Sequence, residues 1–171
     1  MVAEAPRAED SAQAAEAEAA KERVIATVRN RNTSSQLDAE TLSLTTGNPS
    51  AAVKGADVVA GCLPTAAEEQ LLQVACRMAN APLVLGGVEG QRGQLTTVLP
   101  GDPGIALVYR PNHPHIESRR VPDPEPSRVT LVVSAWIAEQ ISTLLLGGDD
   151  LARGRLRYLD MDAEEMTEYP L

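Results

Sequence analysis

Two apolar runs separated by one helix-sized segment constrain the fold of this chain more than any other feature. The first run covers residues 57–62 and the second residues 82–88, and an alternating segment at residues 94–99 follows a glycine-rich turn. Apolar runs without alternation are typical of parallel strands covered on both faces. The spacing therefore predicts a parallel strand-helix-strand unit. Ligand sites in such sheets lie beyond the carboxyl ends of the strands, here near residues 62–65 and 86–92.

The segment between the two runs has clear helix signals. Thr65 and Glu68 have the spacing of a capping box, and Pro64 before them cannot continue a helix backwards. Asn80 and Pro82 mark the end of the helix. Apolar residues at helical spacing predict an inner face of Leu71, Leu72, Ala75, Met78 and Ala79.

Weaker patterns precede this unit. Residues 1–12 are polar and are expected to be disordered. Residues 13–31 are rich in alanine and predict a helix with a narrow apolar stripe near its end. Residues 36–44 predict a strand of low apolar content, and residues 50–54 predict a short helix that leads into the unit.

The second half of the chain predicts a different mixture of elements. Residues 105–109 read as a short strand, and residues 111–126, with five prolines, as an irregular crossover loop. Residues 129–146 predict a buried helix that stops at a glycine pair. The alternating segments 153–160 and 165–171 predict an antiparallel hairpin.

These elements predict an α/β chain. Its expected fold is a truncated Rossmann-like mixed sheet, with a parallel strand-helix-strand core followed by antiparallel strands and a buried C-terminal helix. Residues 1–12 are the expected tail and residues 13–171 the expected domain, with the crossover loop 111–126 inside it.

The composition argues against some classes of binding partner and indicates a cellular compartment. The chain has 171 residues, a net charge of −9, no Phe, one Trp and three Tyr. An acidic chain with few stacking side chains is a poor match for nucleic acid or an anionic membrane surface. The two cysteines, Cys62 and Cys76, have no metal-ligand spacing and suit a reducing cytoplasm.

Several stretches together resemble the ThiF/MoeB/HesA superfamily, the bacterial relatives of ubiquitin-activating enzymes. GADVV, then a capped helix, then APLVLGGVEGQRGQLTTVLPG is similar to the family's run from its fourth strand onwards. The helix 129–146, its glycine pair and GRLRYLD are similar to the family's C-terminal end. The resemblance covers roughly residues 14–171 and corresponds to the C-terminal portion of the family's domain.

The resemblance implies adenylation of the C-terminus of a small ubiquitin-like or sulfur-carrier protein, with ATP and magnesium as cofactors. The chain departs from the family at each step of that chemistry. The first strand, its glycine-rich phosphate loop and the ribose-binding acid have no counterpart, so this chain lacks the N-terminal nucleotide-binding unit. The magnesium aspartate falls on Pro64, an arginine falls on Glu69, and the lysine of the early helix falls near Glu16.

These three positions are degenerate in physical terms. Proline for aspartate removes a metal ligand, and glutamate for arginine reverses a charge, whereas phosphate binding needs N–H groups and positive charge. We therefore expect no catalytic residue and no cofactor for the isolated chain. The resemblance leaves a candidate surface for a carrier tail or partner at Gly87, Val88, Gly93, Gln94 and Thr96.

Other chemistry-bearing residues favour ordinary explanations. The stretch 86–93 lacks G-x-G-x-x-G spacing and leads into a strand, which predicts a hairpin turn. His113 and His115 offer two imidazoles without further metal ligands, so no metal site is expected. Cys62 has no visible cation to activate it, and Asp160 with Asp162 is explained by turn chemistry.

Two functions remain open. The chain is either a pseudo-enzyme that pairs with itself or with a ThiF-like paralogue, or half of a split adenylyltransferase whose nucleotide-binding half is another chain. In both cases the strand at residues 57–62 would be an open sheet edge, which invites pairing with another chain. We therefore expect an oligomer, most simply a two-fold dimer through this edge or through the helix 129–146.

Overall fold

A computed structural model describes residues 8–32, 34, 36–40, 50–63, 65–108 and 128–171. It separates the chain into two compact units, residues 1–43 and residues 44–171, which are described one at a time.

The first unit consists of helix α1, Ala8–Arg31. The helix begins before the predicted start at residue 13, and its alanines explain why it forms. The apolar stripe near the end of α1 is only partly buried, since the Val24 side chain is 55% exposed. Residues 36–40 have no regular secondary structure, so the predicted strand is wrong there, and its remainder lies outside the described residues. Leu37 is the only large apolar side chain in residues 36–40, too little to stabilise a strand.

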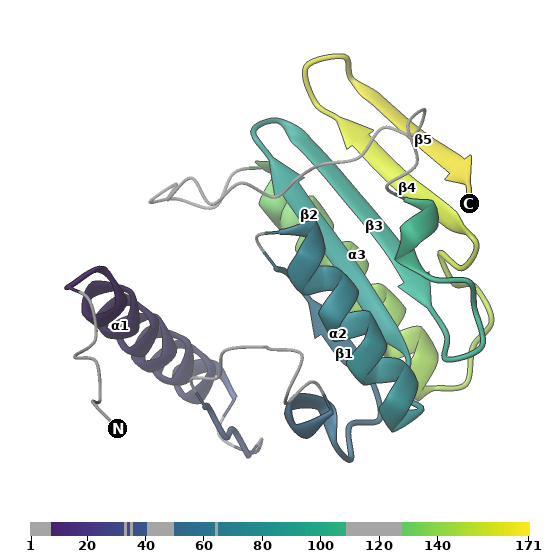
Figure 1. The fold of residues 1–171 in the computed structure, drawn as a ribbon. Coiled ribbons are helices and arrows are strands. Elements are labelled where there is room, and N and C mark those ends of the chain that lie inside the picture. Colours follow the sequence, from purple (N-terminus) through teal and green to yellow (C-terminus); the bar gives the residue numbers. More distant parts are fainter. Residues whose placement is uncertain (1–7, 33, 35, 41–49, 64, 109–127) are drawn as a thin grey trace. The chain divides into compact units, whose positions relative to one another are not determined.

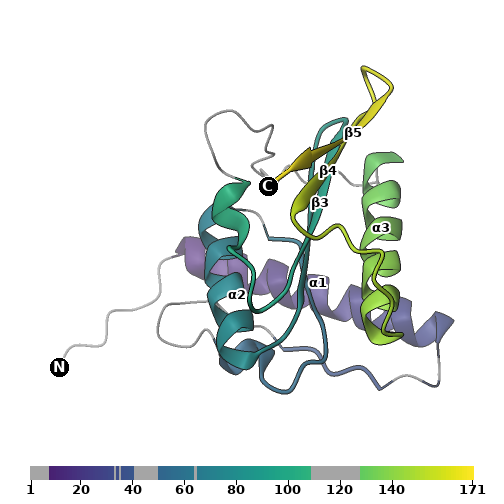
Figure 2. The same ribbon diagram turned by 90° about the vertical axis from the view of Figure 1, so that its right-hand side faces the viewer.

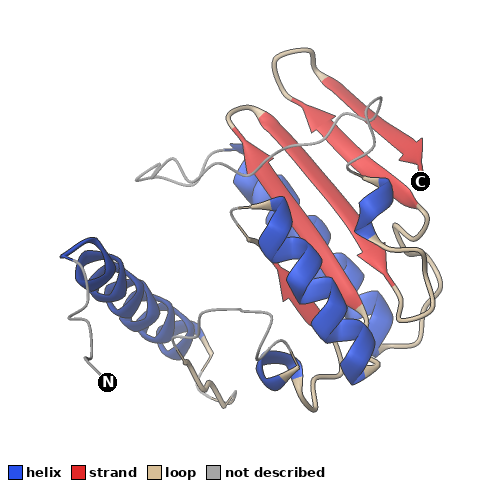
Figure 3. Ribbon diagram, viewed as in Figure 1, coloured by secondary structure: helices blue, strands red, loops and turns tan. Residues whose placement is uncertain are grey.

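The second unit is built on one mixed sheet of five strands in the order β1-β2-β3-β4-β5 (Figures 1 and 3). Its β1–β2 pair is parallel, and the other three pairs are antiparallel. This arrangement confirms the predicted fold class. The strands are β1 Val59–Gly61, β2 Leu83–Glu89, β3 Arg92–Val98, β4 Arg155–Asp160 and β5 Glu165–Pro170.

Helix α2, Ala66–Ala79, packs on one face of the sheet (Figure 2). The Thr65 hydroxyl oxygen accepts a hydrogen bond from the Glu68 N–H, and Asn80 closes the helix in the left-handed region at φ 55°. The predicted inner face is confirmed at Leu72 and Ala75 but is wrong at Met78, which is 66% exposed. The buried residues of α2 are Glu69, Leu72, Gln73, Ala75 and Cys76.

A strand was predicted at residues 105–109, but Ile105–Leu107 form a short 3-10 helix, η2, and residue 109 lies outside the described residues. Gly104 turns the chain at φ 97°, and the Ile105 N–H donates to the Gln73 side chain instead of to a neighbouring strand. The Val108 N–H then closes the turn on the Ile105 carbonyl. The predicted crossover loop 111–126 lies outside the described residues.

Helix α3, Arg128–Leu145, covers the opposite face of the sheet (Figure 2). It approaches the sheet closely because Gly86 and Gly93 have no side chain there: a Cβ on either would lie within about 2.6 Å of Ile137 or Val133 atoms. The predicted helix forms, and it is buried on the face that packs against the sheet, with Val129, Val133 and Gln140 as its buried residues. Its exposed residues include Leu131 (61%) and Leu145 (59%).

The C-terminal hairpin forms as predicted. Strands β4 and β5 pair in register, with Asp160 opposite Glu165. The Asp160 carboxylate accepts hydrogen bonds from the backbone N–H groups of Asp162 and Ala163, at 3.1 and 3.2 Å. This bonding is the turn chemistry expected of Asp160.

Candidate functional site

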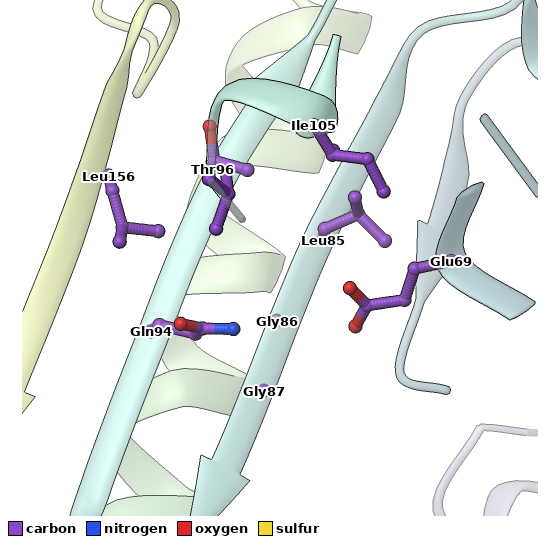
Figure 4. A pocket seen from close by; sticks show the side chains of 9 residues that line it. Glu69, Leu85, Gly86, Gly87, Gln94, Thr96, Ile105 and Leu156 are labelled. Atoms are coloured by element: carbon purple, nitrogen blue, oxygen red, sulfur yellow. The ribbon is translucent and has the colours of Figure 1, made fainter. Parts of the chain in front are cut away.

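A small pocket opens on the α2 face of the sheet, over the centre of β2 and β3 (Figure 4). Elements distant in sequence build it: α2 forms one side, the η2 segment another, and β4 the far wall. The lining residues are Glu69, Leu85, Gly86, Gly87, Gln94, Thr96, Ile105, Val108 and Leu156.

Strand register decides which candidate surface residues reach this pocket. Gly87 lies opposite Gln94 and Leu85 opposite Thr96, and successive residues of a strand point to opposite faces. Gly87, Gln94 and Thr96 therefore belong to the α2 face and line the pocket.

The other two candidate residues lie on the far side of the sheet. Val88 packs with Val129 and Val133 of α3, and the Cα of Gly93 faces the same two valines. The surface predicted from the resemblance is thus divided by the sheet into a pocket part and a part against α3.

Glu69 is the one ionisable side chain among the described residues that line the pocket. It is 5% exposed, and Figure 4 shows its carboxylate directed over Gly86 and Gly87 towards Gln94, whose amide end points back at it. The Glu69 carboxylate also helps to raise the pKa of Cys62, after the larger effect of burial.

Thr96 and Gln94 provide the neutral polar groups of the pocket. Both side chains are almost fully buried, at 3% and 5% exposure. The Thr96 hydroxyl lies 2.9 Å from the Arg155 carbonyl oxygen and 3.3 Å from the Ala152 carbonyl oxygen, so it is anchored towards β4. A hydroxyl that donates to a carbonyl still offers its lone pairs to another group.

The arginines of the second unit that form ion pairs lie elsewhere. Arg153 binds Asp102 with atoms 2.7 Å apart, and Arg92 binds Asp160 at 3.1 Å. Arg157 pairs with Glu168 at 3.1 Å and lies over the Trp136 ring. Among the described residues, no lysine or arginine lines the pocket.

Cys62 follows β1 at the carboxyl end of the strand, where the sequence places a site edge. The residue is exposed, but loss of solvent around its thiol, and then the Glu69 charge, raise the pKa of Cys62. A raised pKa keeps the sulfur protonated at neutral pH and makes it a poor nucleophile.

The remaining candidates are not placed relative to the pocket. Glu16 lies in α1, in the other unit, and Pro64, His113 and His115 lie outside the described residues. Within the described residues, no three His, Cys, Asp or Glu side chains gather closely enough to hold a metal ion. In that same part of the chain, no helix combines the length and apolar character needed to cross a membrane.

The pocket contains residues that sequence patterns did not indicate. Glu69 was expected only as a degenerate position, not as a buried pocket group, and Leu85, Ile105, Val108 and Leu156 were not expected to form its walls. The 3-4 spacing of Glu69, Leu72, Gln73 and Cys76 is the available signal, since it traces the true inner face of α2.

The fold and the position of this pocket define a class: Rossmann-like proteins with a parallel strand pair continued by antiparallel strands. The ThiF family profile matches residues 7–170, and the chain belongs to the ThiF family.

Individual relatives agree with this assignment. Protein HesA of Leptolyngbya boryana is 32% identical over 76 residues, which are 44% of this chain and 27% of HesA. Escherichia coli MccB with MccA-N7isoASN superposes with a TM-score of 0.69 at 16% identity, over 88% of this chain and 48% of MccB. PaaA gives a TM-score of 0.65 at 13% identity, over 88% of this chain and 54% of PaaA. The chain thus spans about a quarter of HesA and about half of the two solved relatives.

Proposed function

We propose that the chain is a non-catalytic member of the ThiF family that acts as a dimer or partner subunit in the activation of a small ubiquitin-like or sulfur-carrier protein. In this role it holds a partner or the carrier tail while another chain carries out the chemistry. ATP and magnesium would be bound by that other chain. The corresponding compartment is the cytoplasm.

One observation carries this proposal: Pro64 and Glu69 stand where the resemblance puts the family's magnesium aspartate and an arginine. Glu69 is buried on α2 and is the one ionisable side chain among the described residues that line the pocket. A buried carboxylate repels a triphosphate, and apolar walls such as Leu85 and Leu156 strengthen the repulsion. Pro64, at the family's magnesium position, supplies no ligand either.

The test is ATP–pyrophosphate exchange with magnesium. We expect no exchange by the chain alone, with or without carrier protein, and a changed rate when it is added to a full-length ThiF-family enzyme encoded beside it. Calorimetric titration of the chain with magnesium–ATP should give no binding heat. Exchange by the isolated chain, or micromolar affinity for ATP, would contradict the proposal.

A second candidate function is half of a split adenylyltransferase, and the position of β1 favours it. Val59–Gly61 pairs with β2 on one side, and no described strand pairs with its other side. A chain that supplied the missing strands could add to this edge. Co-expression decides between the two: exchange activity that appears only with a second chain bearing a glycine-rich phosphate loop would favour the split enzyme.

A further inference from the structure

The outer side of α3, which faces away from the sheet, carries leucines where a surface helix usually carries charge (Figure 2). Leu131 and Leu145 lie near the two ends of the helix and are exposed, and Leu146 follows directly. Between the first two leucines, the exposed residues other than Glu139 are small, and they are Ser134, Ala135, Ala138 and Ser142. An exposed apolar strip of this kind is typical of a protein–protein contact.

This outer side is also almost free of charge. Between Arg128 and Asp149, the sequence contains one ionisable side chain, Glu139. Its carboxylate is paired with Arg157 of β4, with Oε2 and Nη1 3.4 Å apart. Successive residues of a helix are about 100° apart, so Glu139 projects to one side of a line through Ala138. A partner that covers this line buries apolar and small side chains and leaves Glu139 at the margin.

The strip reads the same in both directions along the helix. Leu131 and Leu145 are each seven residues, about two turns, from Ala138. Two antiparallel copies with their Ala138 residues in contact therefore place Leu131 of each copy opposite Leu145 of the other. The small side chains of Ala135, Ala138 and Ser142 allow the two helix axes to approach to about 8 Å. A second copy of the same strip is thus a matching surface.

The charges at the two ends of the helix favour the same arrangement. Arg128 begins α3, and Asp149 and Asp150 follow shortly after its last residue; all three are exposed. Antiparallel packing brings the arginine of each copy to the acidic end of the other. Parallel packing would instead place like charges together, which is unfavourable.

We propose that the outer side of α3 is the surface through which two copies of this chain pair, antiparallel and related by a two-fold axis beside Ala138. The contact surface, here called the α3 seam, consists of Leu131, Ala135, Ala138, Ser142 and Leu145. A two-fold contact uses the same patch on both copies, as the symmetric spacing of these residues requires. The inference deepens the proposed function and rests on it in one respect, namely that the chain acts as a dimer.

Disulfide cross-linking of the full chain tests the position of the axis. The background is Cys62→Ser, which removes the exposed thiol and keeps the buried Cys76. Helix axes about 8 Å apart, with Cα atoms about 2.3 Å from each axis, bring facing residues into the range of about 4.4–6.8 Å that a disulfide spans. With oxidised glutathione and micromolar protein, Ala138→Cys should link to its own copy on the order of a hundredfold faster than Met166→Cys, an exposed control on β5, because pairing gives a millimolar effective concentration.

A second pair of variants tests the direction of packing. Leu131→Cys alone should not link faster than the control, because the two copies of this residue would be 14 positions, about 21 Å, apart along the seam. A mixture of Leu131→Cys and Leu145→Cys proteins should link quickly and only as the mixed dimer. That dimer keeps its other Leu131–Leu145 contact, and the result does not depend on whether Ala138→Cys folds.

The inference would be overturned if Ala138→Cys and the mixture both linked no faster than Met166→Cys. It would also be overturned if Leu131→Cys linked rapidly to itself, since this requires parallel helices. Pyrophosphate exchange by the isolated chain would refute the non-catalytic role and leave positive cross-links standing. Absent cross-links without exchange would refute the α3 seam and leave that role standing, so the two failures are distinguishable.

Discussion

The Gln73 side-chain oxygen accepts a hydrogen bond of 2.8 Å from the backbone N–H of Ile105, inside the protein. Gln73 is 8% exposed and comes from α2, whereas Ile105 opens the η2 segment that forms one wall of the pocket. The contact fixes the chain where η2 begins, after the end of β3. Gly104 completes the arrangement, because a Cβ there would lie 2.0 Å from the Gln73 amide nitrogen.

Gln73→Leu should destabilise the protein, because it leaves the buried Ile105 N–H without its acceptor. The expected loss in the free energy of unfolding is about 1–3 kcal/mol. Urea denaturation measures it, with Gln70→Leu, an exposed residue of the same helix, as the control. Equal stability of the two variants would show that the hydrogen bond contributes nothing.

The close approach of α3 to the sheet predicts that Gly93→Ala is destabilising. The new Cβ would lie 2.6 Å from a Val133 methyl and 2.9 Å from a Val129 methyl, so α3 must shift. Overpacking of this kind costs about 1–3 kcal/mol. Gly101→Ala is the matched control, since its Cβ would meet nothing within 4 Å. A Gly93→Ala variant as stable as this control would refute the packing argument.

Sequence patterns predicted the elements whose signals are local. Thr65, Glu68 and Asn80 marked both ends of α2, and period-2 alternation located the β4–β5 hairpin. The continuous apolar runs correctly indicated a parallel pair covered on both faces, because α2 and α3 lie on opposite sides of it.

The errors arose where tertiary contacts override local preference. Ile105–Leu107 form η2 and not the predicted strand, because the N–H of Ile105 donates to the distant Gln73 side chain. The inner face of α2 is rotated from the predicted one because Glu69 and Gln73 are buried by groups from elsewhere in the fold. No local sequence pattern predicts that an acidic side chain will be buried. The pocket could therefore not be predicted from the sequence and was found only in the structure.

Cys62 should react slowly with thiol reagents. Its pKa is raised by loss of solvent and by the Glu69 carboxylate, so the thiolate fraction at pH 7 is small. We expect iodoacetamide to modify Cys62 in a Cys76→Ser background more slowly than a free cysteine peptide, with the rate rising above pH 9. Cys62→Ser should leave any partner-dependent activity intact. Fast alkylation at neutral pH, or loss of activity in a folded Cys62→Ser variant, would show a functional thiol.

The Asp102–Arg153 pair should make stability depend on acid pH. Partial burial alone would raise the pKa of Asp102, but the hydrogen bonds from Arg153 and from the Leu99 N–H outweigh it and lower this pKa. A lowered folded-state pKa means that the stabilisation is complete above the unfolded value of about 4 and is lost as pH falls through the folded value. The stability difference between the native protein and Asp102→Asn should therefore be largest near pH 7 and shrink below pH 4. Asp149→Asn, at an exposed position, serves as control. A difference that is constant from pH 7 to pH 3 would contradict the linkage.

Assembly is the last prediction, and two surfaces bear on it. The outer side of α3 exposes Leu131 and Leu145, and the adjoining Leu146 is 86% exposed. Along this side, Ala135, Ala138 and Ser142 separate the first two leucines at alternating spacings of four and three residues, the pattern of a helix-packing seam. If two α3 helices packed antiparallel with their Ala138 residues together, Leu131 of each copy would lie opposite Leu145 of the other. Two copies related by a two-fold axis would therefore bury the same residues.

We expect the full chain to be a dimer in light scattering over a dilution series. The double variant Leu131→Glu with Leu145→Glu should shift it to monomer, because four carboxylates would be buried in the seam at several kcal/mol each. Met166→Glu alters a residue on β5 that is 66% exposed and should leave the dimer intact. A dimer that survives the double change would instead use the open edge of β1, where Val59–Gly61 has no second described neighbour. A monodisperse native monomer at low micromolar concentration would refute both surfaces.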